Sequence, residues 1–198
     1  MNKVIFLVAM EEEAEYIKKS FNINLKIEKN FYKSEKFDNL FILVTGVGVG
    51  NVLKTITNCF NEKLFDKNDK FINIGYVGSP SYNVGDIIDI SCAKRLFEPQ
   101  KVKNLNKTFT LKSVFADENI CKNSTLYTAD DFVENRELTE KDCVVDMEGY
   151  YIACMIENVH MIKIVSDNLC LKDCNEAHRK ECINNAWENL LNNIKKVI

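Results

Sequence analysis

Short runs of apolar residues alternate along the chain with stretches of helical periodicity. Val4–Ala9, Leu40–Thr45 and Phe71–Tyr76 are apolar at almost every position, which is typical of strands buried on both faces of a sheet. Weaker patterns predict further strands at Phe31–Phe37, Val84–Ser91, Phe109–Phe115, Ser124–Thr128, Cys143–Asp146 and His160–Val165.

Helical periodicity fills most of the intervals between these strands. Helices are predicted at Glu11–Ser20, from about Asn51 to Lys63, at Met147–Asn158 and at Asn175–Val197. Strands that alternate with helices indicate an α/β fold, whose central sheet we expect to be mixed, twisted and largely parallel. No repeat, linker or low-complexity stretch divides the 198 residues, so a single domain over 1–198 is expected.

Composition narrows the class of protein. Apolar residues make up 46% of the chain and charged residues 28%, and the net charge is −3. These values exclude a disordered chain and argue against a nucleic-acid partner. The longest early apolar run, Val4–Met10, is too short for a signal peptide or a membrane span and is followed at once by three glutamates. A cytoplasmic protein with reduced cysteines and no membrane partner is expected.

Cysteine and histidine recur every four residues near the carboxyl end, at Cys170, Cys174, His178 and Cys182. On an α-helix such a row drifts by about 40° per step, so its four side chains would not converge on one ion. The spacing also differs from zinc motifs. A cysteine-lined helix face is therefore favoured over a metal site, and no metal is expected.

A glycine-rich loop, Gly46-x-Gly48-x-Gly50, follows one of the predicted strands. It is similar to a dinucleotide-binding fingerprint, but Asn51 stands where the third glycine belongs and no acidic residue ends a strand about 20 residues later. The pattern favours a loop whose backbone approaches a small ligand closely, and a plain tight turn is the alternative.

Carboxylates occur where predicted strands end, at Glu13, Glu148 and Asp167, with Asp130 and Asp146 nearby. Each of them alone is consistent with capping of a helix start. Parallel strands bring their carboxyl ends to one edge of the sheet, however, and ligands bind there. Several carboxylates in one partly dry cleft cannot all be charged at low cost, so one would hold a proton. A protonated carboxyl beside an ionised one is the pair of groups that typically cleaves a glycosidic bond.

Seven segments in order resemble the motifs of 5′-methylthioadenosine/S-adenosylhomocysteine nucleosidases, which belong to the purine nucleoside phosphorylase superfamily. The resemblance covers nearly the whole chain and involves the family's opening segment, SGIG loop, NTGSAG strand end, VGD turn, D-x-F-I segment, VEMEG motif and AISD signature. The matching segments are Ala9–Glu13, Val44–Gly48, Asn73–Gly78, Val84–Ile87, Asp130–Val133, Val145–Gly149 and Ile164–Asp167.

The resemblance implies a role for each carboxylate. Asp167, oriented near Ser166, would be the general acid that protonates N7 of the purine. Glu13 would position and deprotonate the attacking water. Glu148 would accept the ribose 2′ and 3′ hydroxyls, and Met147 would pack under the sugar.

The resemblance also implies residues that contact the base and complete the pocket. Phe132 would stack on the purine while the backbone of Val133 pairs with its edge. The remaining residues expected to bind substrate are Met10, Gly75, Tyr76 and Lys163. A three-layer α/β/α domain, a homo-oligomer with a dimer favoured, and no cofactor are implied as well.

The chain departs from the family pattern at several positions. Tyr76 replaces a serine, Lys163 replaces an arginine four residues before the acid, and Ala177 stands where an aromatic lid residue is usual. The segment between about 92 and 123 is shorter than in typical members. Because of these departures, the resemblance does not identify the 5′ substituent of the substrate.

The expected activity is hydrolysis of the N-glycosidic bond of an adenine nucleoside or thionucleoside, such as methylthioadenosine or S-adenosylhomocysteine. A phosphate-dependent phosphorylase is one alternative. It is disfavoured because Arg95, Arg136 and Arg179 lie outside the motifs and Glu13 would repel phosphate. A degenerate nucleoside-binding protein with little catalysis is the other alternative.

Overall fold

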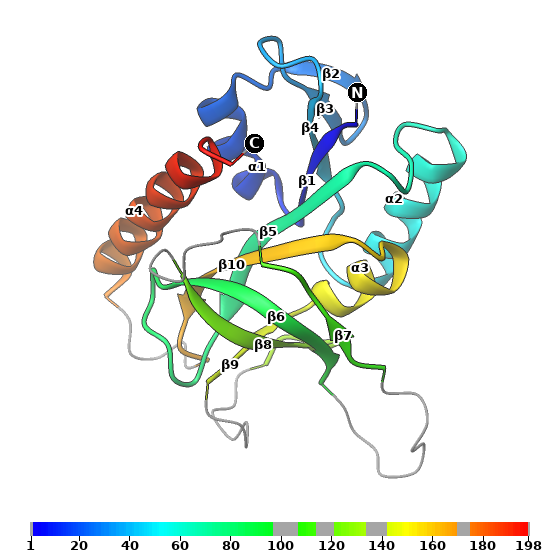
Figure 1. Cartoon of the computed structure of the whole chain (residues 1–198). Helices are drawn as coiled ribbons and strands as arrows, with labels where there is room; N and C mark the ends of the chain where they lie inside the picture. Colours follow the sequence, from blue (N-terminus) through cyan, green and yellow to red (C-terminus); the bar gives the residue numbers. More distant parts are fainter. Residues whose placement is uncertain (1, 97–106, 114–120, 134–141, 170–174, 198) are drawn as a thin grey trace.

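The computed structural model describes residues 2–96, 107–113, 121–133, 142–169 and 175–197, which form four helices and ten strands (Figure 1). In chain order these are β1 (Val4–Val8), α1 (Glu11–Phe21), β2 (Leu25–Glu28), β3 (Phe31–Lys33), β4 (Leu40–Val44), α2 (Val49–Asn61), β5 (Lys70–Gly78), β6 (Ile87–Arg95), β7 (Phe109–Thr110), β8 (Lys122–Thr128), β9 (Cys143–Asp146), α3 (Gly149–Met155), β10 (Val159–Asp167) and α4 (Glu176–Ile194).

Every helix predicted from periodicity is present, with shifted ends. The predicted helix at Met147–Asn158 is shorter and begins at Gly149, which leaves Met147 and Glu148 in the loop after β9. The strand β2 was not predicted. Its Leu25 and Ile27 alternate with Lys26 and Glu28, but the stretch is only four residues long and all of them are exposed. The predicted strand Phe109–Phe115 is only two residues long, and its last two residues lie outside the described part of the chain.

The sheet is mixed, and the prediction of a largely parallel sheet is not confirmed. Parallel pairs join β1 to β4 and β5, β5 to β10, and β8 to β6 and β9. An equal number of described pairs is antiparallel: β2–β3, β3–β4, β5–β9, β6–β7 and β6–β10. The parallel strands β4, β1, β5 and β10 nevertheless form one continuous block.

Five strands close on themselves at one end of this sheet. The pairing runs from β5 through β9, β8, β6 and β10 and returns to β5. The pairing of β5 with β9 is a single register, Gly78 opposite Val145. This closure brings the end of β9 against the carboxyl end of β5 (Figure 1).

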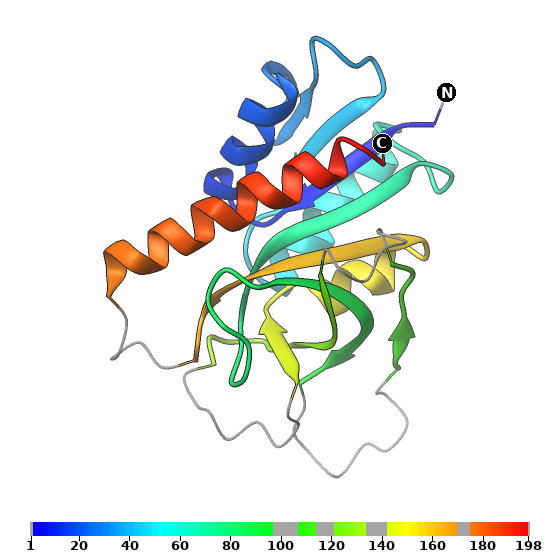
Figure 2. The same ribbon diagram turned by 60° about the vertical axis from the view of Figure 1, so that its left-hand side comes forward.

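The core lies on both faces of the sheet because successive strand residues point to opposite sides. In β1, Ile5 and Leu7 belong to the core cluster that includes residues of α2 and α3. Their neighbours Phe6 and Val8 belong to the cluster that includes residues of α1 and α4. Helices α1 and α4 run close together along one side of the molecule (Figure 2).

Two further predictions concern membranes and metals. In the described residues no helix is both long enough and apolar enough to cross a membrane. The described side chains also contain no group of three or more histidine, cysteine or acidic residues placed to hold a metal ion. Cys170 and Cys174 lie outside the described residues, as does much of the shortened segment between about 92 and 123.

Candidate active site

A cleft of about 320 Å³ opens at the carboxyl ends of β1, β5, β9 and β10. Most of the residues predicted to form the site line it, although they come from separate parts of the chain. These are Met10, Glu13, Tyr76, Phe132, Met147, Glu148, Ser166 and Asp167. Three predicted residues, Gly75, Val133 and Lys163, do not line this cleft.

Glu13 is held rigidly by backbone donors from two strand ends. Its carboxylate accepts hydrogen bonds from the N–H groups of Ala9 and Met10 at Oε2 and of Tyr76 at Oε1, each at 2.9 Å. The side chain is 1% exposed. Burial raises the pKa of Glu13, and the backbone donors and the Lys163 ammonium oppose that rise. A fixed, buried carboxylate with a raised pKa is a good proton acceptor.

Gly75 and Gly48 each lie against a carboxylate of the cleft, Gly75 against Glu13 and Gly48 against Glu148. A Cβ on Gly75 would lie 2.8 Å from Oε1 of Glu13, so only glycine leaves room for that carboxylate. Gly48 has a φ of 83°, a conformation that side chains rarely adopt. Its N–H donates to Oε1 of Glu148 at 2.8 Å. The glycine loop therefore orients a carboxylate of the cleft with the N–H of Gly48.

Glu148 is the residue directly before helix α3 and is almost completely buried at 7% exposure. Burial, followed by the nearby negative charge of Asp146, raises the pKa of Glu148 to about 7. The Lys163 ammonium and the Gly48 N–H oppose the rise. The sequence predicted that one carboxyl of the cleft would hold a proton, and the raised pKa values belong to Glu13 and Glu148.

Lys163 lies beneath the cleft in a buried ion pair. Its Nζ is 2.9 Å from Oδ2 of Asp146, and both side chains are no more than 2% exposed. Asp146 also accepts hydrogen bonds from Thr128 Oγ1 at 2.6 Å and from the Gly149 N–H at 2.9 Å. The ammonium of Lys163 thus fixes the start of α3, and Asp146 is a capping residue there, as the simpler interpretation expects.

Asp167 ends β10 and faces the cleft partly exposed. Ser166 Oγ donates to its Oδ2 and the Leu169 N–H donates to its Oδ1, both at 2.9 Å. The hydroxyl of Ser166 and the Leu169 N–H therefore hold the Asp167 carboxyl in one orientation.

The aromatic residues of the cleft differ in their surroundings. Phe132 is 58% exposed and lines the cleft. Tyr76 is anchored instead, because its hydroxyl accepts a hydrogen bond from Trp187 Nε1 at 3.0 Å. Burial raises the pKa of Tyr76, so its hydroxyl is neutral and serves as a hydrogen-bonding group.

Arg179 is a cleft residue that the sequence did not single out. It lies in the first turns of α4, half-buried, and its Nε donates to the Ser166 carbonyl at 2.8 Å. The guanidinium therefore stands directly behind the residue that orients Asp167. No motif contains it, and its position follows only from the packing of α4 against the end of β10.

Asp130 is excluded from the site by its own partners. It is ion-paired with Arg95 and accepts a hydrogen bond from the Tyr151 hydroxyl. These two groups hold the pKa of Asp130 below its ordinary value. Asp130 thus caps no described helix start, and it links Arg95 of β6 to Tyr151 of α3 instead of lining the cleft.

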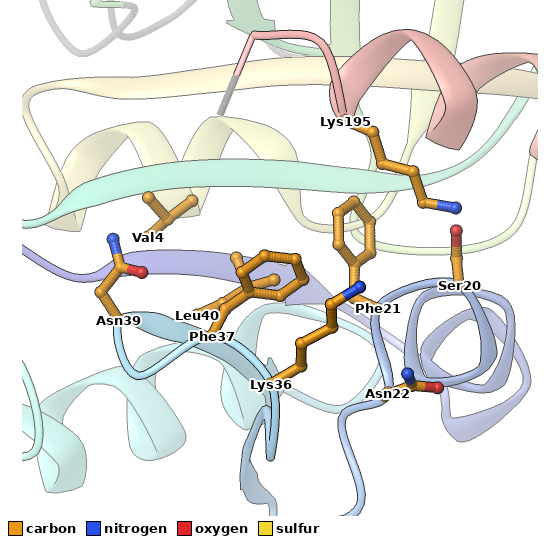
Figure 3. Close-up of a pocket in the computed structure, with 9 residues that line it drawn as sticks. All are labelled: Val4, Ser20, Phe21, Asn22, Lys36, Phe37, Asn39, Leu40 and Lys195. Carbon is orange, nitrogen blue, oxygen red and sulfur yellow. The ribbon is translucent and has the colours of Figure 1, made fainter.

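Another cavity, of about 340 Å³, lies at the opposite ends of β1 and β4 (Figure 3). Phe21, Phe37 and Leu40 form its apolar part, while Lys36 and Lys195 provide its charge. Among the described residues that line it, none has a carboxylate side chain. Because it offers no acid–base pair, the chemistry assembled at the carboxyl ends of the strands identifies the first cleft as the candidate active site.

Comparisons with known proteins show which solved structures share this fold. No family model and no curated protein matches the sequence. Among solved structures, 5′-methylthioadenosine/S-adenosylhomocysteine nucleosidase from Helicobacter pylori, with butyl-thio-DADMe-Immucillin-A, is similar with a TM-score of 0.80 and 17% identity. The match covers 100% of this chain and 97% of that one.

Two further solved structures extend this likeness. The corresponding nucleosidase from Neisseria meningitidis, in complex with methylthio-immucillin-A, has a TM-score of 0.74 and 18% identity, with 96% of each chain covered. Futalosine hydrolase of Helicobacter pylori has a TM-score of 0.76 and 16% identity, covering 99% of this chain and 97% of that one. The chain therefore has the mixed α/β fold found in the 5′-methylthioadenosine/S-adenosylhomocysteine nucleosidases and in futalosine hydrolase.

Proposed function

We propose that the protein is a purine nucleosidase that hydrolyses the N-glycosidic bond of a nucleoside. The observation that carries the proposal is the meeting of Glu13, Glu148 and Asp167 in one cleft. The likeness to nucleosidases and futalosine hydrolase supports it at the level of the fold.

Each carboxyl has a separate task in this reaction. Asp167, oriented by Ser166 and Leu169, donates a proton to N7 of the purine and so makes the base a better leaving group. Glu13 accepts the proton of a water molecule whose oxygen forms the new bond to C1′. Glu148 accepts hydrogen bonds from the ribose hydroxyls, and its negative charge stabilises the positive charge that develops on the sugar. The products are the free base and the ribose moiety.

Water is favoured over phosphate as the nucleophile. Glu13 is a buried carboxylate fixed by three backbone donors, and it would repel a phosphate dianion. Arg179 is the one basic residue among those lining the cleft in the described part of the chain. It supports the phosphorylase alternative only weakly, because phosphate sites usually combine several donors.

The substrate that we propose is an adenine nucleoside with a 5′ substituent, such as methylthioadenosine or S-adenosylhomocysteine. Phe132 would stack on the base, with the backbone of Val133 at its edge, and Met147 would lie under the sugar. We also propose a cytoplasmic homodimer, which sedimentation of the purified protein would test.

The test is release of adenine from these two nucleosides by the purified protein without added phosphate. Asp167→Asn is expected to lower kcat by about 10²- to 10⁴-fold, the usual contribution of a general acid. Asp130→Asn is the matched control, since Asp130 is exposed and engaged by Arg95 and Tyr151. Equal activity of the two variants would refute the assignment of Asp167, and a strict need for phosphate would establish a phosphorylase.

A further inference from the structure

The candidate active site continues into a second cleft of about 460 Å³ between the first turns of α1 and α4. Met10, Tyr76 and Arg179 line both clefts. None of the residues proposed to bind the base or the ribose lines the second one. If the nucleoside lies in the first cleft, the second is therefore the space left for its 5′ substituent.

Charge distinguishes this second cleft from an apolar pocket. Its lining includes Glu12, Glu176, Arg179 and Lys180. Lys180 is already engaged, with its Nζ 2.9 Å from Glu176 Oε1. Tyr16 and Asn184 satisfy each other through a hydrogen bond of 2.6 Å. Among the charged groups, Arg179 forms no ion pair with any residue that the structure describes.

The hydrogen bond from Nε of Arg179 determines which of its nitrogen atoms can bind a ligand. Its Nε is committed to the Ser166 carbonyl at 2.8 Å, which leaves the two terminal amino groups to act as a fork. Such a fork matches the two oxygens of a carboxylate. A phosphate dianion fits less well, because Glu12 and Glu176 line the same cleft and would repel the larger charge.

We propose that Arg179 determines specificity by binding a carboxylate at the end of the substrate's 5′ substituent. The inference rests on the proposed nucleosidase function and narrows its substrate class. The carboxylate belongs to an α-amino acid, as in S-adenosylhomocysteine, or to an aromatic acid. A substrate with a short apolar 5′ group gains nothing from this contact.

The experiment compares kcat/KM for three adenine nucleosides with wild-type protein and three variants. The 5′ substituents are methylthio, homocysteinyl and a carboxyphenylthio group. Arg179→Met, which removes the charge but keeps the bulk, is expected to lower kcat/KM for the carboxylate substrates by about 10- to 100-fold, chiefly through KM. Loss of the hydrogen bond to the Ser166 carbonyl lowers kcat for all three nucleosides alike. The decisive quantity is therefore the preference for the carboxylate substrates over methylthioadenosine, which should fall by about 10- to 100-fold in Arg179→Met and be partly retained in Arg179→Lys.

Lys195→Met is the control, because Lys195 lies in the cavity at the opposite end of the sheet (Figure 3). An equal loss for all three nucleosides in Arg179→Met would overturn the proposal and leave Arg179 only the task of holding Ser166. A phosphate requirement that disappears in Arg179→Met would also overturn it. The carboxylate substrate whose kcat/KM falls more in Arg179→Met shows whether the bound acid is an α-amino acid or an aromatic acid.

If the protein is not a nucleosidase, the results differ from those that would refute the role of Arg179. In that case the wild-type protein releases base from none of the nucleosides, and calorimetry measures their Kd values directly. A 10- to 100-fold weaker binding of the carboxylate nucleosides to Arg179→Met, with the Kd of methylthioadenosine unchanged, would still support the role of Arg179. Equal Kd values for wild type and variant would refute it.

Discussion

Gly75 lies directly behind the carboxylate of Glu13, so close that a Cβ on Gly75 would come within 2.8 Å of Oε1. Gly75→Ala should therefore displace the carboxylate that activates the water. A shift of about 1 Å in a positioning group can cost about 10²-fold in rate. We expect kcat to fall by about 10- to 100-fold, with a smaller change in KM, in a steady-state assay of base release.

Gly50→Ala is the matched control for this substitution. Gly50 lies in the first turn of α2, and a Cβ there would meet no atom within 4 Å. Alanine also favours a helix more than glycine does. Activity in Gly50→Ala should equal that of the wild type, and a Gly75→Ala enzyme with full activity would show that Glu13 is not held as tightly as the contact requires.

The raised pKa of Glu148, about 7, predicts an acidic limb in the pH profile. The charged form of Glu148 accepts hydrogen bonds from the ribose hydroxyls, and the protonated form predominates below the pKa. We therefore expect kcat/KM to fall up to tenfold per unit as the pH drops below about 7. The measurement is kcat/KM from pH 5 to 9, with Glu148→Gln expected to show low activity and to lose this limb. A limb near the ordinary value of 4.5 would contradict the prediction.

The buried pair of Lys163 with Asp146 predicts a large loss of stability when one partner is removed. Lys163→Met leaves Asp146 as an unpaired buried charge, which typically costs about 3–5 kcal/mol. Thermal or denaturant unfolding measures this change. Lys163→Arg keeps the charge and should cost less.

Lys180→Met provides the comparison at the surface. Its ion pair with Glu176 is more than two-thirds exposed on both sides, and such pairs contribute about 0–1 kcal/mol. If Lys163→Met were no less stable than Lys180→Met, the interaction with Asp146 would not contribute as the burial predicts.

The local pattern of the sequence predicted most elements because the central strands are apolar along their whole length. Cys143–Asp146 was predicted with its observed bounds. The exposed strand β2 was missed because Leu25 and Ile27 alternate with charged residues instead of forming an apolar run, and its pairing with β3 defines it. Strand direction was also out of reach, because β6 and β9 pair with neighbours of both orientations.

The site shows the same division between local and tertiary information. Glu13, Glu148 and Asp167 could be identified because each lies at or shortly after the end of a strand. The motifs contain no sign of Arg179, which reaches the cleft only because α4 packs against the end of β10. Lys163 was expected to bind substrate, whereas the structure places its ammonium on Asp146 beneath the cleft.

Strand β10 has a consequence for how the protein is made. It is the last of the described strands, yet it is paired with β5 on one side and β6 on the other. Until it is synthesised, those two strands present open edges that can pair with other chains. An amino-terminal fragment that stops before β10 should therefore aggregate, and translation must reach residue 167 before the three carboxylates can be brought together.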